Sequence, residues 1–367
     1  MSSGMRRARR DGTGAADDHA GVRTDVEPPI AAPPAGVIAV RDRTTSVLVR
    51  VWDQQYRPGI SHRAMSGFFL LVVAFSALVQ ILAGDPDGSP SRIHLVTVVA
   101  FLLGYLLPGS HVFWRPLALR RLGTEPWRAV PARVLRAGRR SAVVEVTDDG
   151  DPVRFTVWID PAHLAMVTDT VYLVRGKGDR AVVRVPGSRE PFPAKVSRRP
   201  VTPVEIPAVP VTQRWAEELR DRVRRVYAQA AVALGVVLII AEITTPSLVT
   251  ALIWLGFTLI VGLAVATTTR HRALDLRLPA LVDSAEWLPA EADLGPWLAQ
   301  HDGTVPATAT LTFDDGTVRV VVMPAASVDL IGAISDSAEL WITGIEGRVA
   351  VGFPGYPLLA VGEVVSA

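Results

Sequence analysis

The most prominent pattern along the chain is a set of four long apolar runs separated by polar stretches. The runs cover residues 68–83, 93–114, 226–244 and 248–267. Each is close to the ~20 residues that a helix needs to cross ~30 Å of hydrocarbon, and no charged residue lies in its central part. A helix in a soluble core usually keeps a polar stripe, which these runs lack. The pattern therefore predicts four transmembrane helices, with buried hairpins of a soluble core as the alternative.

Short polar turns join the runs in pairs and indicate two antiparallel hairpins. Residues 84–92 separate the first two runs, and residues 244–247 separate the last two. Arginines cluster at the opposite ends of both hairpins, whereas the turns hold only Arg92. Because positively charged flanks face the cytoplasm, we expect both termini and both soluble domains to be cytoplasmic. This predicts a multi-pass protein of the plasma membrane.

The segments that follow the two hairpins are similar to each other. Both contain an Asp-Asp-Gly turn between strand-like runs, at residues 148–150 and 314–316. A Val-Pro-Gly sequence at 185–187 corresponds to Phe-Pro-Gly at 353–355. Matching points lie about 165 residues apart, and the hairpins recur with nearly the same offset. We interpret this as a duplication of one unit, a hairpin plus a β domain; convergence of two hairpins with Asp-Gly turns is the alternative.

Each β domain has the pattern of a small barrel. In the first copy, five strand-like runs cover residues 132–135, 142–147, 153–159, 171–174 and 181–185. Between the third and the fourth, Asp160 is suited to cap a short helical turn, with Pro161 in its first position. This order is typical of an OB-like barrel, and an SH3-like barrel is the alternative. In the second copy the first strand is not evident, and residues 278–300 are expected to form an irregular or helical arm.

The predicted fold class is therefore membrane α plus soluble β, in tandem repeat. Residues 1–36 form a polar tail with four prolines, which is expected to be disordered. Residues 37–65 are a juxtamembrane segment. The other predicted segments are hairpin 1 (66–114), barrel domain 1 (125–190), a Pro-rich linker (191–211), a polar helix with hairpin 2 (212–267) and β-rich domain 2 (278–367).

Composition excludes some functions. Hydrophobic residues make up 49% of the chain, and the mean hydropathy is +0.29. The absence of cysteine excludes disulfides, thiol catalysis and cysteine metal sites. A net charge of +2 is too balanced to indicate a nucleic-acid partner. The arginines within residues 6–10 are not followed by an apolar segment, so we expect no cleavable signal peptide.

Known chemical motifs do not identify a catalytic, cofactor-binding or metal-binding residue. The seven histidines share no metal-ligand spacing. Residues 85–88 resemble the start of a calcium loop but contain a proline and lack the downstream glutamate. The paired aspartates at 148–149 and 314–315 are explained by turn chemistry. We therefore predict no site residues, no cofactor and no enzymatic activity.

The apolar runs also lack the polar groups that transport requires. Only Gln80, Gln229 and Glu242 interrupt them, and ionisable groups at membrane depth are the usual sign of a transport pathway. Small residues spaced by four at 231–235 and 262–266 would let helices approach closely. The runs therefore favour helix packing or self-association over transport.

An apolar hairpin followed by a β-β-β-helical turn-β-β barrel resembles the NfeD-like family of membrane-anchored OB modules. The resemblance covers roughly residues 66–187 and 228–355, and the duplication departs from the family's usual single unit. Actinobacterial integral membrane proteins of the same general build are similar as well. The resemblance implies a protein that organises membrane-associated partners and, in its short forms, is not catalytic.

Together these observations predict a non-enzymatic integral membrane protein, a scaffold or regulatory module that presents two cytoplasmic β domains to protein partners. The expected partners are the lipid bilayer and proteins or further copies bound through the transmembrane helices, with no nucleic acid. The second hypothesis is an accessory subunit of a membrane transporter or channel. The third is a membrane-anchored enzyme without a recognisable motif.

Overall fold

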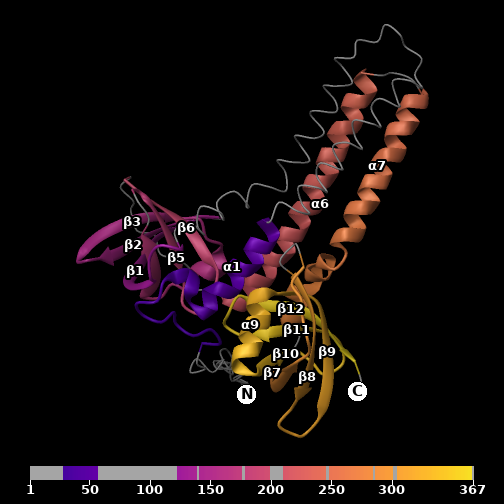
Figure 1. The fold of residues 1–367 in the computed structure, drawn as a ribbon. Helices are drawn as coiled ribbons and strands as arrows, with labels where there is room; N and C mark the ends of the chain where they lie inside the picture. Colours follow the sequence, from indigo (N-terminus) through magenta and orange to yellow (C-terminus); the bar gives the residue numbers. More distant parts are fainter. Residues whose placement is uncertain are drawn as a thin grey trace, which may run out of the picture.

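The computed structural model describes residues 28–56, 122–138, 140–175, 178–198, 210–244, 248–283, 286–300 and 304–365. These residues form two β-barrels and a long helical hairpin (Figure 1). The predicted first hairpin, 66–114, and most of the predicted tail lie outside the described residues.

The predicted membrane fold is wrong. None of the helices in the described ranges combines the length and the apolar character needed to cross a bilayer. The fold class with four transmembrane helices and the plasma-membrane localisation are corrected accordingly. The third and fourth apolar runs belong to α6 (Val211–Thr244) and α7 (Leu248–Thr269), and α6 begins in a charged stretch. An apolar run in a sequence indicates a hydrophobic helix, but it does not by itself show that the helix lies in a lipid bilayer.

The N-terminal part and the first barrel contain three helical segments and six strands. These are η1 (Ala39–Arg41), α1 (Arg43–Tyr56), β1 (Arg128–Ala137), β2 (Ala142–Asp148), β3 (Asp151–Val157), α5 (Pro161–Leu164), β4 (Thr170–Arg175), β5 (Arg180–Arg184) and β6 (Pro191–Val196). The strands close in the order β1-β2-β3-β6-β5-β4, with β1 paired to both β2 and β4. We call this unit barrel 1.

The second barrel follows the hairpin and has the same strand order. Its elements are η2 (Arg272–Arg277), α8 (Leu278–Asp283), β7 (Leu288–Leu294), β8 (Thr304–Thr312), β9 (Val318–Ser327), α9 (Val328–Ser337), β10 (Glu339–Ile342), β11 (Gly347–Phe353) and β12 (Leu358–Val365). Read from β7, the closed order is β7-β8-β9-β12-β11-β10, which reproduces barrel 1 strand for strand. We call this unit barrel 2.

Each barrel has six strands, whereas the sequence predicted five for the first copy and left the first strand of the second copy undefined. In barrel 1 the sixth strand is β6, which lies within the stretch 191–211 expected to be a linker and pairs with β3 and β5. In barrel 2 the first strand is β7, which lies within the stretch 278–300 expected to be an irregular or helical arm. The prolines at the first and third positions of β6 obscured its strand pattern, because proline is uncommon inside a sheet.

The barrel interiors are filled by alternating apolar side chains. In β8 the inward positions include Val305, Ala307, Ala309 and Leu311, and the residues between them are exposed. This period of two is expected for a strand with one face in a core. One core cluster fills barrel 1 and another fills barrel 2, so each barrel encloses its own core.

The predicted Asp-Gly turn of barrel 1 is confirmed. Asp148 pairs with Asp151, and the two residues between them have positive φ, 53° at Asp149 and 92° at Gly150. Two residues with positive φ make the tight turn that matches the twist of paired strands. Glycine serves here because it adopts this conformation without steric cost.

Helices α6 and α7 lie side by side and project away from both barrels (Figure 1). Along α7, large apolar side chains are exposed at intervals of three or four residues, which places them on one helix face. We call this set the α7 stripe; it comprises Leu248, Leu252, Leu255, Leu259 and Leu263. A contiguous exposed apolar surface of this kind is typical of an interaction surface.

Candidate functional site

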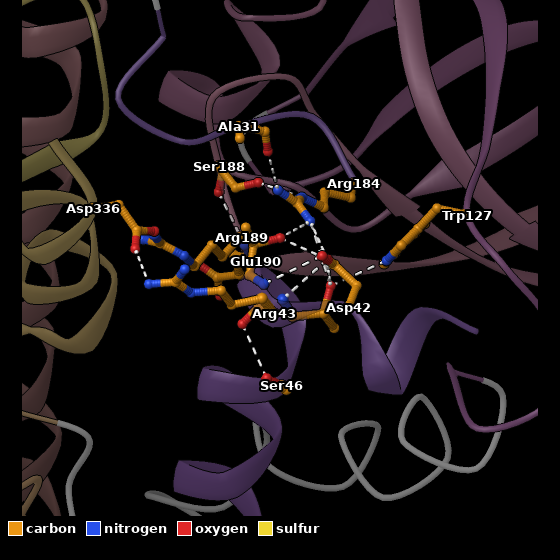
Figure 2. Close-up of polar contacts among 12 residues, drawn as sticks. Ala31, Asp42, Arg43, Ser46, Trp127, Arg184, Ser188, Arg189, Glu190 and Asp336 are labelled. Carbon is orange, nitrogen blue, oxygen red and sulfur yellow. Dashed lines mark hydrogen bonds and ion pairs between the residues drawn. The ribbon is translucent and has the colours of Figure 1, made fainter. Parts of the chain in front are cut away.

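The most unusual chemistry in the described residues is a set of charged side chains at the contact between the two barrels, most of which are buried. We call it the inter-barrel seam, and it comprises Asp42, Arg184, Arg189, Asp329 and Asp336. Figure 2 shows Asp42, Arg184, Arg189 and Asp336 of this set. Charged side chains are seldom fully buried unless they are paired. The seam is therefore the first place to look for function.

Asp42 lies at the N-terminus of α1 and accepts hydrogen bonds from the first turn. Its carboxylate accepts from the backbone N–H of Thr44 and of Thr45 at 3.2 and 3.1 Å, and from their hydroxyls at 2.6 and 2.8 Å. Aspartate is favoured at this position because it satisfies N–H groups that have no partner inside the helix. The Asp-Arg-Thr-Thr sequence thus explains locally why α1 begins here.

Arg184, the last residue of β5, connects this helix start to barrel 1. Its side chain is 1% exposed, and its Nη1 lies 3.1 Å from Oδ2 of Asp42. The same nitrogen donates to the Thr44 hydroxyl at 2.7 Å, and Nε donates to the carbonyl of Ser188 at 2.6 Å. Burial by itself would raise the pKa of Asp42, but hydrogen bonds from the two threonines and the charge of Arg184 outweigh it and lower this pKa. Asp42 is therefore held as a carboxylate.

Arg189 connects barrel 1 to α9 of barrel 2. Its Nη1 donates to the backbone carbonyl of Asp329 at 2.9 Å, and its Nη2 donates to Oδ2 of Asp336 at 2.6 Å. Gly332 leaves the space for this side chain, because a Cβ there would lie 3.0 Å from Nη1. Asp336 also accepts from Arg43 of α1 at 3.2 Å. A single carboxylate at the end of α9 thus ties α1 and both barrels together (Figure 2).

The carboxyl group of Asp329 lies at the start of α9 without such partners. Burial raises its pKa to about 6, and the charge of Arg189 opposes this shift only in part. Its Oδ1 is buried and has no hydrogen-bond partner among the described residues, and neither has Nε of Arg189. The seam therefore contains one carboxyl group that is poorly compensated when ionised.

A second buried group joins barrel 1 to α6, and we call it the α5–α6 contact. Asp160 caps α5, as predicted, by accepting from the N–H groups of Ala162 and His163 at 3.1 and 3.0 Å. Its other oxygen lies 2.7 Å from Nδ1 of His163 and 3.6 Å from Nη2 of Arg222 in α6. The Arg222 guanidinium lies 4.7 Å from the ring centre of Trp215, a cation–π distance.

The His163 ring is enclosed by two aromatic rings. Phe192 and Trp215 meet it edge to face at 4.9 and 5.0 Å. Burial by itself would lower the pKa of His163, but the charge and hydrogen bond of Asp160 outweigh it and raise this pKa. The ring therefore holds its proton more tightly than an exposed histidine does.

The Asp-His pair has the geometry of a general base but not its surroundings. A general base has to reach the proton that it abstracts, and His163 is 2% exposed between two aromatic rings. In the described part of the chain, no group of three or more His, Cys, Asp or Glu side chains could hold a metal ion. The arrangement is suited to holding α5 against α6.

The paired aspartates considered from the sequence lie in different environments. Asp148 is buried and lies 3.1 Å from Arg128 and 3.0 Å from Arg175, whereas Asp149 is exposed. In barrel 2, Asp315 accepts from the backbone N–H of Thr317 at 2.8 Å, as a turn residue does. Turn chemistry therefore accounts for the barrel 2 pair but not for Asp148. Residues 85–88 and Gln80 lie outside the described residues.

Sequence reasoning missed the seam. One signal in the sequence could have indicated the seam. Arg184 is a charged residue inside the run 181–185, whose other residues are apolar. A second signal is the Asp-x-Thr-Thr sequence at 42–45, which has the form of a helix cap. Neither signal identifies the partner, because the interacting residues lie 142 positions apart.

No family model, curated protein or solved structure matches this chain. The resemblance to membrane-anchored OB modules thus stays a prediction.

Proposed function

We propose that this protein is a non-enzymatic scaffold that holds two β-barrel modules in one arrangement for protein partners. The observation that carries the proposal is the placement of the buried charges. Arg184 and Arg189 of barrel 1 pair with groups on α1 and on barrel 2. Such pairs fix the relative position of elements, because breaking one leaves an uncompensated buried charge.

Exposed apolar groups supply surfaces for partners. The α7 stripe extends along the projecting hairpin, and each barrel exposes a tryptophan, Trp158 after β3 and Trp297 between β7 and β8. Tryptophan is enriched among the residues that dominate binding energy at protein interfaces. The two tryptophans are not at corresponding positions of the repeat, so the two modules offer different surfaces.

The test compares the full-length protein with variants of its exposed surface. Wild type, the double variant Leu255→Gln/Leu259→Gln and the control Val318→Gln are produced at equal levels, and their neighbours in cells are identified by chemical cross-linking and mass spectrometry. All three positions are exposed, so the changes leave the packing of the described residues intact. We expect at least one protein, a second copy included, to lose about tenfold in linkage to the stripe variant, the equivalent of about 1.4 kcal/mol.

Two results would contradict the scaffold. One is an identical set of cross-linked proteins for all three forms, which would leave the stripe without a protein partner. The other is that the stripe variant loses binding to lipid vesicles while its association with proteins stays at the wild-type level. Turnover of a small molecule by the purified chain would also reject the non-enzymatic assignment.

A further inference from the structure

Helices α1 and α6 hold corresponding places in the two halves of the chain. We call the described residues from 28 to 198 repeat 1 and those from 210 to 365 repeat 2, and each contains one of these helices and the barrel that follows it. Thr44 is the second residue of α1 and Thr212 is the second residue of α6, and both are buried. They lie 168 positions apart, the same separation as that between Val185 and Phe353 of the Pro-Gly loops.

The first turn of each helix is fastened to the barrel of its own repeat at the same place. The Thr44 hydroxyl accepts a hydrogen bond from Nη1 of Arg184, at the end of β5, at 2.7 Å. The Thr212 hydroxyl accepts from the backbone N–H of Gly355, which follows β11, at 2.7 Å. Because β5 and β11 are the fifth strands of their barrels, the two attachments correspond.

Beyond its first turn, α1 packs against the barrel of the other repeat. Val51 is buried in the cluster that fills barrel 2, and Val47 and Leu48 pack against that cluster. Nη2 of Arg43 lies 3.2 Å from Oδ1 of Asp336, near the end of α9. Helix α1 therefore reaches barrel 2 at the helix that joins its third and fourth strands.

Helix α6 makes the reciprocal contact with barrel 1. The Trp215 ring meets the His163 ring of α5 edge to face at 5.0 Å. Nη2 of Arg222 lies 3.6 Å from Oδ2 of Asp160, which caps α5. Helix α5 occupies in barrel 1 the place that α9 occupies in barrel 2, between the third and the fourth strand. Each repeat thus supplies a helix to the same part of the other repeat.

The two helices are also alike in the side chains that they bury. After the threonine, apolar residues follow at three, four and seven positions, and this spacing places them on one helix face. They are Val47, Leu48 and Val51 in α1 and Trp215, Ala216 and Leu219 in α6.

The loops that follow the fifth strands contact each other. They contain the Val-Pro-Gly sequence at 185–187 and the Phe-Pro-Gly sequence at 353–355. A Cβ on Gly187 would approach the ring of Tyr356 to 2.6 Å, so one loop lies directly against its counterpart. In a pair related by a twofold axis, every contact occurs twice in reciprocal form, and elements near the axis meet their own counterparts. The contacts between the repeats have this form.

We propose that each repeat carries a self-complementary docking surface, formed by α5 or α9 and the loop after the fifth strand, whose partner is a second repeat of the same kind. The chain is therefore a covalently joined pair that closes on itself about an approximate twofold axis. Both surfaces are occupied within one chain, so other partners bind elsewhere. The inference does not rest on the scaffold role and holds whatever partner the modules bind.

The test cuts the full-length chain between the repeats. A protease site is placed within residues 199–209, which join repeat 1 to repeat 2 and lie outside the described residues. Cleavage of the folded protein turns an intramolecular contact into a bimolecular one, so its strength then depends on concentration. We expect the two products to stay together at micromolar concentration, measured by native mass spectrometry, and their dissociation constant is then measured by dilution.

One variant on each side tests the reciprocity. Asp336→Arg places a like charge beside Arg43 and Arg189, and Arg222→Glu places a like charge beside Asp160. Like charges that face each other across an interface are costly. Each variant should therefore raise the dissociation constant of the cleaved pair at least about tenfold.

A matched control and two milder variants separate docking from folding. Asp179→Arg reverses an exposed charge that pairs with Arg198 within barrel 1, and it should leave the dissociation constant unchanged. Asp336→Asn and Arg222→Gln remove one charge with little change of shape and should weaken the pair in the same direction but less. Circular dichroism of each uncleaved variant confirms that the chain is folded before it is cut.

Four results would overturn the reciprocal pairing. Products of the wild type that separate on cleavage would show that the repeats do not recognise each other. A wild-type dissociation constant in both reversal variants would assign the association to other contacts. A loss in only one of them would reduce the docking to one side and refute its symmetry, and an equal loss in the control would indicate a general effect of charge. Cross-linking of the α7 stripe variant is independent of all four, so failure of the pairing is distinguishable from failure of the scaffold.

Discussion

Barrel 1 and barrel 2 have the same strand order but differ in the chemistry that they bury. Barrel 1 contributes Asp148, His163, Arg184 and Arg189 as buried charged or titratable side chains, whereas the buried polar groups of barrel 2 are Thr304, Thr343 and the Oδ1 of Asp329 in α9. The interior of barrel 2 is completed by apolar residues of α9, a longer helix than its counterpart α5. One topology thus supports two roles: barrel 1 supplies the buried arginines of the contact, and barrel 2, built around its apolar core, supplies the groups on α9 that accept from Arg189.

The corresponding helices show how the difference arises. Asp160 caps α5 and Ser327 caps α9, each at the same place between the third and fourth strands of its barrel. The Asp160 side chain also reaches His163 and Arg222, whereas the Ser327 hydroxyl accepts from the N–H of Leu330 in its own helix. The charged capping residue Asp160 therefore also interacts with the neighbouring helix α6, whereas the neutral capping residue Ser327 binds within its own helix α9.

The largest expected effect comes from breaking the buried ion pair of barrel 1. Arg184→Met removes the partner of Asp42 and leaves its carboxylate buried without a counter-charge. We expect the free energy of unfolding to fall by about 3–5 kcal/mol, measured by urea denaturation. Arg198→Met, which removes an exposed pair with Asp179, should cost about 0–1 kcal/mol. Equal losses for both variants would contradict the different roles of buried and exposed charge.

A smaller effect separates two aspartates at corresponding positions of the repeat. Asp148→Asn in barrel 1 weakens the buried contacts with Arg128 and Arg175 and should cost about 1.5–3 kcal/mol. Asp314→Asn changes an exposed residue in barrel 2 and should stay within about 0.5 kcal/mol. Thermal or urea unfolding of both variants tests the comparison. A loss at Asp314 as large as that at Asp148 would mean that the two turns are energetically alike.

The smallest effect concerns the contact between the barrels. Gly332→Ala places a Cβ 3.0 Å from Nη1 of Arg189, so the arginine has to move. The gain in helix propensity, about 1 kcal/mol, should be outweighed by the disturbed contact. In an Arg189→Ala background the same substitution should become stabilising, because the obstacle is gone. A double-mutant cycle measures this reversal, and the absence of any coupling between the two positions would refute the contact.

Local signals in the sequence predicted part of the fold. The Asp-Gly turn at Asp149 and the Asp160 cap of α5 were predicted from residues within four positions of each other, and both are present. Strand patterns in barrel 1 were recognised because alternation needs only neighbouring residues. The sixth strand β6 was missed, because its prolines hide the alternation and only its pairing with β3 and β5 makes it a strand. The seam was missed for a related reason, since Arg184 is fully buried only through contacts with residues far away in the sequence.

By itself the sequence determined the short-range features of this protein, namely its turns, its helix caps, its apolar runs and the presence of two similar β units. These features depend on backbone preferences and side-chain periodicity, which act over a few residues. Only the tertiary structure decided that the barrels close with six strands, that Arg184, Arg189 and Asp148 are buried while Asp314 is exposed, and that none of the described helices could span a membrane. The physical reason is that burial and ion pairing are properties of the surroundings, and distant segments of the chain supply those surroundings.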